Sequence, residues 1–174
     1  MYFGKILIND FGSVADRDKA ANYIAKNPHF FTPLFDLACD QKSERVHILA
    51  AWVLEKYTLE QLELLTPVLD QFLKGTLVQK NESKRRPMIK LLYHYCKSIT
   101  RRAKLSKKRI DLIVEICFSY MLESQKAASL AFSMKTIHFF RKHADWIDTE
   151  IEAYIEKKLP NSSPGFRSVV RQIS

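Results

Sequence analysis

The chain has 174 residues, 47% hydrophobic and 27% charged, which is typical of one folded domain with a substantial core. Its four Gly and six Pro argue against a sheet protein, which needs many tight turns, and no apolar run approaches the roughly 18 residues that cross a bilayer. Lys and Arg outnumber Asp and Glu by 28 to 19, and the net charge of +9 points to an acidic partner.

The chain start lacks the long apolar region and the small-residue cleavage site of a signal peptide, so we expect a cytoplasmic protein. The three cysteines, Cys39, Cys96 and Cys117, are odd in number and lie far apart, with no C-x-x-C spacing. Two of them fall on apolar faces. We therefore expect core thiols, and neither disulfides nor a zinc site.

The first part of the chain predicts one pair of helices. Residues 1–12 are compatible with a short helix or with an extended arm. Ser13 is suited to cap a helix that ends before Asn27-Pro28, and Thr32-Pro33 has the character of a cap followed by a first helical residue. These two helices form the first predicted repeat, residues 13–40.

Two apolar triplets then recur with a period of 41 residues. Both triplets keep helical spacing, so each unit of the period predicts two antiparallel helices. One triplet begins at Leu69, Ile110 and Ile151, and the other begins at Ile48, Ile89 and Leu130. The predicted helices are 43–57 with 66–74, 84–102 with 107–123, and 125–142 with 146–158; a short helix over 59–65 stays open.

Helix pairs at this spacing are typical of HEAT and armadillo arrays. The predicted repeats are 13–40, 43–75, 84–123 and 125–159, within a single domain over 1–174. The segment 163–174 is amphipathic, through Phe166, Val169, Val170 and Ile173, and is predicted to cap the open end of the stack. The fold class is therefore all-α, a right-handed α-α superhelix (HEAT/armadillo-like) of about four helix pairs plus a C-terminal capping helix.

Short sequence motifs agree with this fold. They are Arg45 followed by Ala50-Ala51-Trp52-Val53-Leu54, the pair Thr66-Pro67, the run Ala131-Phe132-Ser133-Met134-Lys135, and Ser163-Pro164-Gly165-Phe166-Arg167. Over roughly residues 13–174 the chain resembles the short bacterial HEAT-like proteins that are related in fold to DNA-alkylation-repair glycosylases. The resemblance implies an α-solenoid fold, and such motifs specify fold better than function.

The stretch 84–109 holds eleven Lys and Arg residues and no Asp or Glu, so it contains the whole positive excess of the chain. Placed on one helix, its apolar residues fall on one face, and four of its cations fall on the opposite face. The apolar face consists of Met88, Leu92, Tyr95, Cys96 and Ile99, and the cationic face of Arg86, Lys90, Lys97 and Arg101. Pro87 is compatible with this helix if Ser83 caps it, because Pro87 then lies in the first turn.

No pattern of residues predicts catalysis or metal binding. The group of residues that comes nearest to a catalytic site is His143, Asp145, Trp146 and Asp148, in the turn between the last two repeat helices. We interpret Asp145 there as a helix N-cap and Trp146 as a packing residue. No pair of histidines has the spacing of a zinc site, and Gly-rich phosphate loops and nucleophile motifs are absent from the sequence. No catalytic residue, metal or cofactor is therefore predicted.

Two functions from different classes stay open. The preferred one is a non-enzymatic interaction scaffold that binds an acidic partner, either a nucleic-acid backbone or an acidic protein, through the stretch 84–109. Tyr93 is a candidate for stacking on bases. The predicted contact residues are Arg86, Lys90, Lys97, Arg101, Lys104, Lys107, Lys108 and Arg109.

The alternative is a DNA-repair glycosylase-like enzyme that acts on alkylated bases. The first helix of a HEAT pair usually lies on the convex side, so the cationic face is expected to point away from the groove that such an enzyme would use. An anionic membrane surface is a weaker third candidate, because the cationic helix lacks exposed large apolar residues.

Overall fold

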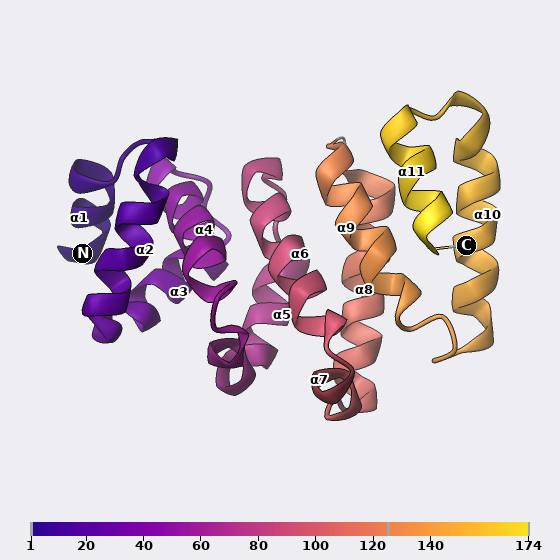
Figure 1. Cartoon of the computed structure of the whole chain (residues 1–174), viewed down its shortest axis with the longest axis horizontal. Helices are drawn as coiled ribbons and strands as arrows, with labels where there is room; N and C mark the ends of the chain where they lie inside the picture. Colours follow the sequence, from indigo (N-terminus) through magenta and orange to yellow (C-terminus); the bar gives the residue numbers. More distant parts are fainter. Residues whose placement is uncertain (1, 125, 174) are drawn as a thin grey trace. The chain divides into compact units, whose positions relative to one another are not determined.

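The computed structural model describes residues 2–124 and 126–173 (Figure 1). Every regular element over these residues is helical, which confirms the all-α class. None of the described helices combines the length and the apolar character needed to cross a bilayer. The chain divides into two compact units, one up to His94 and the other from Tyr95 onward, and helix α6 (Glu82–Lys97) spans the division.

The first unit is built around α4 (Arg45–Thr58), which packs against α1 (Tyr2–Asp10), α2 (Arg17–Lys26) and α3 (Phe31–Cys39). Helix α3 also packs against α5 (Leu69–Leu77). Short 3-10 turns over Val14–Asp16, Pro28–Phe30 and Leu62–Val68 precede α2, α3 and α5. The core of this unit includes Leu34, Phe35, Leu54, Leu65 and Phe72, each at most 2% exposed.

Of the two interpretations of residues 1–12, the short helix is the one observed, as α1. Its Phe3 ring stacks on Phe30 with centroids 4.9 Å apart, and Leu7 is buried. Phe11, just beyond the helix, lies against Tyr23 at 5.5 Å. Apolar packing therefore holds α1 on the rest of its unit.

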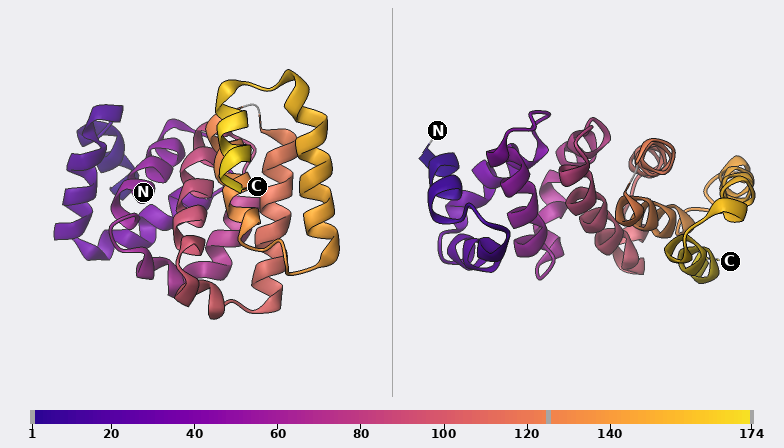
Figure 2. Two further views of the ribbon diagram at one scale, coloured as in Figure 1. Left: turned by 45° about the vertical axis from the view of Figure 1, so that its right-hand side comes forward. Right: turned by 90° about the horizontal axis from the view of Figure 1, so that it is seen from above.

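The second unit contains α7 (Ile99–Ala103), α8 (Lys107–Glu123), α9 (Ala127–His138), α10 (Asp145–Lys158), a 3-10 turn (Leu159–Asn161) and α11 (Pro164–Ile173). Helix α9 packs against α8 and α11. Seen from above, α8 and α10 lie on one side of this unit and α9 and α11 on the other (Figure 2). Helix α11 buries Phe166, Val169 and Ile173, as its amphipathic pattern predicts.

The helices predicted from the 41-residue period are observed with shifted ends, except that 107–123 matches α8 to the residue. The predicted repeat boundaries themselves stay predictions. Several starts differ because a 3-10 turn precedes the helix. Ser13 thus occupies the position before the turn Val14–Asp16 rather than before α2, and its side chain makes no capping bond. Thr66-Pro67 lies inside the turn Leu62–Val68. The predicted N-cap Asp145 is instead the first residue of α10, after Ala144.

The helix predicted over 84–102 is broken at Ser98, which corrects the predicted apolar face. Ser98 has an extended backbone, and its hydroxyl accepts a hydrogen bond from the Arg101 N–H, so it caps the short helix α7. Met88, Leu92, Tyr95 and Cys96 are buried as predicted. Ile99 follows the break and is 75% exposed, so its prediction as a core residue is wrong.

Pro87 lies inside α6 and not in its first turn, so the prediction of a Ser83 cap is also wrong. The helix starts after Asn81, whose side-chain oxygen accepts a hydrogen bond from the Ser83 N–H at 2.8 Å. In a regular helix the N–H of residue 87 would donate to the Ser83 carbonyl. Pro87 has no N–H, so this carbonyl has no donor within the helix. The indole Nε1–H of Trp52 donates to that carbonyl at 2.9 Å and replaces the missing bond.

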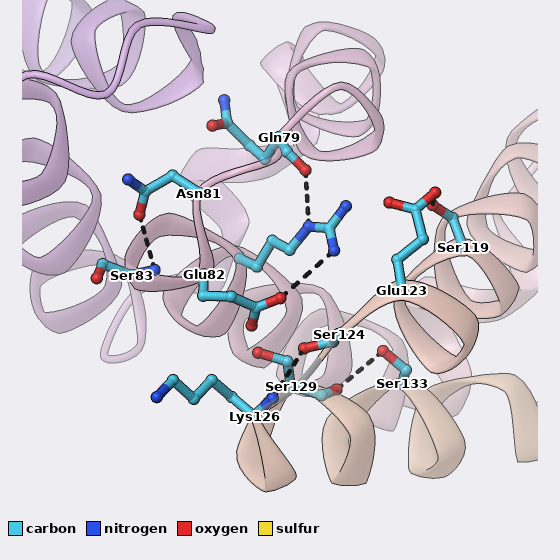
Figure 3. Close-up of polar contacts among 11 residues, drawn as sticks. Gln79, Asn81, Glu82, Ser83, Ser119, Glu123, Ser124, Lys126, Ser129 and Ser133 are labelled. Atoms are coloured by element: carbon cyan, nitrogen blue, oxygen red, sulfur yellow. Dashed lines mark hydrogen bonds and ion pairs between the residues drawn. The ribbon is translucent and has the colours of Figure 1, made fainter.

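Cationic side chains bind carbonyl oxygens where helices of the first unit end. Lys84 is completely buried, and its Nζ donates to the carbonyls of Asp40 and Lys42, just beyond α3. Arg85 is 2% exposed; its Nε donates to the Gln79 carbonyl at 2.7 Å, and its guanidinium pairs with Glu82 at 3.4 Å (Figure 3).

The second unit repeats this arrangement. Arg101 Nε donates to the Tyr95 carbonyl at 2.9 Å, and Arg102 donates to the carbonyls of Cys96 and Lys97, so both side chains cap the end of α6. Arg141 donates to the Ile173 carbonyl at the end of α11, at 3.0 Å. Each bond satisfies a carbonyl that the helix itself leaves without a donor.

The three cysteines are free and buried, as predicted for core thiols. Burial raises the pKa of the Cys39 and Cys96 thiols to about 12 and that of the Cys117 thiol well above its usual range. The thiolate form that reacts with alkylating reagents is therefore suppressed at neutral pH.

We predict that Arg102→Ala lowers the free energy of unfolding by about 1–3 kcal/mol, because two carbonyls lose a charged donor. The variant also loses the contact of the guanidinium with the Phe139 ring, 4.5 Å from its centroid. Chemical denaturation measures the change. Lys104→Ala removes an exposed cation from the same stretch and should change stability by less than about 0.5 kcal/mol. Equal losses in the two variants would contradict the capping role.

A second prediction concerns Trp52 and Pro87. Trp52→Phe should lower the free energy of unfolding by about 1–3 kcal/mol, because the Ser83 carbonyl is left without a donor. In a Pro87→Ala background the residue 87 N–H can bond that carbonyl, so Trp52→Phe should cost less. A double-mutant cycle from denaturation curves measures this coupling, and purely additive effects would show that the indole bond does not replace the proline's missing donor.

A third prediction follows from the thiols. In the native protein at about pH 8, iodoacetamide should modify none of the cysteines within minutes, because little thiolate forms and the sulfur atoms are buried. After unfolding in guanidinium chloride, all should react, as counted by intact mass. Rapid modification of the native chain would mean that its core opens readily.

Candidate partner-binding site

The stretch 84–109 divides into buried and exposed cations. In the first unit Lys84 and Arg85 are buried, so they are unavailable to a partner. Lys90 is half-buried and forms an ion pair with Glu55, whose side chain is 11% exposed. Arg86 is exposed. Among the predicted contacts in this unit, Arg86 is thus the one that offers an open charge.

The second unit contributes a group of lysines around α7. Lys97 ends α6, Lys104 follows α7, and Lys107 and Lys108 begin α8; all are exposed. Over the described residues, none of them has an ion-pair partner. We call Lys97, Lys104, Lys107 and Lys108 the α7 lysines. They lie at or beside the connections between α6, α7 and α8.

The remaining predicted contact residues already make contacts within the protein or are half-buried. Arg101 caps α6, and its guanidinium lies 5.3 Å from the centroid of the Tyr95 ring. Arg109 is half-buried, and its backbone N–H bonds the Ser106 hydroxyl that caps α8. Tyr93 is half-buried, with its ring against His94 at 5.1 Å, and its role in base stacking stays a prediction.

A groove that the sequence did not predict lies between α8 and α10, with a volume of about 610 Å³. Its apolar floor includes Phe118 and Trp146, whose rings stack with centroids 5.5 Å apart. Trp146 is nevertheless 53% exposed, and Leu122 at the groove edge is 72% exposed. The interpretation of Trp146 as a packing residue thus holds for one face of its ring.

Two polar contacts tie α8 to α10 and the turn before it. Within the groove lining His143, just before α10, lies 2.7 Å from an Asp111 carboxylate oxygen. Outside the lining the buried Tyr154 hydroxyl donates to the Met121 carbonyl at 2.7 Å. Burial raises the pKa of this phenol, so it remains a donor. The walls of the groove are therefore held in place without a ligand.

Carboxylates form the rim of the groove. Asp111, Glu115 and Glu150 all line it and are exposed. Asp111 faces His143, whereas Glu115 and Glu150 have no ion-pair partner over the residues that the structure covers. The rim is thus negative, although the chain as a whole carries a charge of +9.

The group His143, Asp145, Trp146 and Asp148 does not form one site. His143 pairs with Asp111, and Trp146 lines the groove. The Asp148 carboxylate instead bonds Arg141, which also pairs with Glu152 at 3.2 Å. No three His, Cys, Asp or Glu side chains among the described residues are placed to hold a metal ion.

A signal for the groove was present in the sequence of α8. Its buried residues, such as Ile113 and Tyr120, already account for the face that packs in the core. Phe118 and Leu122 are large apolar residues four positions apart on another face. An apolar stripe beyond the core face indicates a second contact surface.

In a comparison with known families, residues 8–174 match a HEAT repeat domain family. No curated protein and no solved structure matches the chain. The similarity to alkylation-repair glycosylases therefore stays a prediction. The match covers nearly the whole chain and agrees with the helical architecture, so this chain belongs to the HEAT repeat domain family.

Proposed function

We propose that this protein is a non-enzymatic interaction scaffold that binds an acidic partner through the α7 lysines. HEAT repeats are stacked helix pairs whose surfaces bind partners. The observation that carries the proposal is the exposure of these lysines in a stretch of chain without a single carboxylate. None of these lysines has an ion-pair partner over the residues that the structure describes, so each presents its charge to solvent.

The form of these charges favours a nucleic-acid backbone as the partner, with an acidic protein segment as the other version. Arg101 and Arg102 have the planar donors that read a base edge in pairs, but these donors bind carbonyls of α6. The exposed charges that remain around α7 are lysines, which neutralise phosphates as point charges. Binding of this kind is independent of base sequence and weakens steeply with salt.

We predict that the wild-type protein binds duplex DNA at about 50 mM salt and binds it about 100-fold more weakly at about 200 mM, as expected for about four neutralised phosphates. Changing all the α7 lysines to Glu should abolish binding without changing the circular dichroism spectrum. Electrophoretic mobility shift and fluorescence anisotropy measure the affinity.

A matched control changes Lys5, Lys26, Lys142 and Lys157 to Glu. These lysines are also exposed, so the net charge falls equally while the α7 lysines remain. The control should keep most of the affinity. Equal losses in both variants would show that net charge, and not this surface, binds DNA, and no binding by wild type would reject the nucleic-acid version.

The glycosylase-like alternative has its own test, which is incubation with methylated DNA followed by detection of abasic sites. The scaffold proposal expects no release of base. Release that disappears with Asp148→Asn would contradict the proposal and favour an enzyme.

A further inference from the structure

We propose that the groove between α8 and α10 binds a basic amphipathic helix of a partner protein. This site is distinct from the α7 lysines and has the opposite charge. The inference therefore goes beyond the proposed function and does not depend on it.

The groove exposes large apolar side chains to solvent. Leu122 and Trp146 are mostly exposed, and the Phe118 ring continues the apolar surface between them. A cleft of about 610 Å³ with an aromatic floor accommodates several apolar side chains at once. Covering these side chains removes apolar surface from water and favours binding.

The shape of the groove fits a helix. On α8 its lining residues Asp111, Glu115, Phe118 and Leu122 follow one another at helical spacings of three and four. This stripe extends along most of α8, which is roughly 25 Å long at 1.5 Å per residue. A helix of a few turns laid along the stripe would place residues of its apolar face against Phe118, Leu122 and Trp146.

The negative charges of the rim favour a partner of positive charge. Glu115 and Glu150 are exposed carboxylates, and Lys and Arg are absent from the lining residues that the structure describes. A phosphate would be repelled here, whereas Lys or Arg beside the partner's apolar face would be attracted. A cation would also be favoured over the exposed face of the Trp146 indole.

A second copy of this chain is a poorer fit. Its own basic segment at α7 presents one large exposed apolar side chain, Ile99, on a helix of five residues. One such side chain fills only part of the cleft. The bonds that tie α8 to α10 and the turn before it, from Tyr154 and His143, also indicate a site formed before the partner arrives.

The test uses two fluorescein-labelled peptides of about 16 residues, roughly 24 Å of helix. One contains leucine and lysine with leucines at helical spacing, and the other has glutamate in place of each lysine. By fluorescence anisotropy at about 150 mM salt, the leucine–lysine peptide should bind at least about tenfold more tightly. Equal affinities, or tighter binding of the leucine–glutamate peptide, would overturn the proposal.

Variants locate the binding. The double variant Glu115→Lys with Glu150→Lys should bind the leucine–lysine peptide at least about tenfold more weakly. A matched control, Glu60→Lys with Glu156→Lys, makes the same charge change at exposed sites outside the groove and should leave the affinity within about twofold. Trp146→Ala should also lose binding while the circular dichroism spectrum is kept. Groove variants that bind like wild type would overturn the proposal.

Two further measurements identify other occupants. In sedimentation experiments the wild type should not self-associate through the groove. Self-association that Trp146→Ala removes would show that the occupant is a second copy. A single-stranded oligonucleotide should not quench the emission of Trp146. Quenching that Trp146→Ala abolishes would show that the occupant is a base. Either result would overturn the partner-helix proposal.

Discussion

An α-helix ends with carbonyl groups that have no donor within the helix, and in this chain cationic side chains supply some of the missing donors. The usual alternative is a glycine in the left-handed conformation after the helix, and no described residue has a positive φ. Lys84 bonds carbonyls beyond α3, Arg101 and Arg102 bond those of α6, and Arg141 bonds that of α11. Positive charge at the negative end of a helix dipole is also favourable. Burial lowers the pKa of Lys84, with Asp40 acting in the opposite direction, so its carbonyl partners are essential to a buried amine.

Because several cations are used within the fold, the net charge overstates the charge that a partner can reach. The eleven Lys and Arg residues of the stretch 84–109 are adjacent in sequence, but they have different roles. Lys84 and Arg85 belong to the interior, Lys90 is paired with Glu55, and Arg101 and Arg102 terminate a helix. The charge available to a partner is therefore smaller than the composition implies, and in the second unit it consists of lysines. Lysine attracts a polyanion without imposing a geometry, which suits binding that does not read sequence.

Helix α8 carries two surfaces of opposite charge. Its first turn presents Lys107 and Lys108, and the acidic rim of the groove includes Asp111, three residues beyond Lys108, and Glu115, seven residues beyond it. At 1.5 Å per residue these carboxylates lie about 5 and about 10 Å from Lys108 along the axis. The two surfaces therefore adjoin on one helix. In the proposed functions an acidic partner binds the α7 lysines and a basic partner binds the groove of the same unit. Salt should weaken the binding of the acidic partner more, because the groove adds apolar contacts.

The sequence by itself determined the helices and most of the core. Apolar spacing places residues such as Phe72 and Ile113 inside, because this signal arises within a single helix. The helix pairs that the 41-residue period marks stay a prediction. The tertiary structure alone decided where each cation points, where Pro87 finds a substitute donor, and that α8 and α10 leave a groove. Lys84 and Arg86 are equivalent in charge, yet one is buried and the other exposed. The difference is physical: the carbonyls that accept from Lys84 belong to Asp40 and Lys42, more than forty residues earlier, and only folding brings them within hydrogen-bond distance.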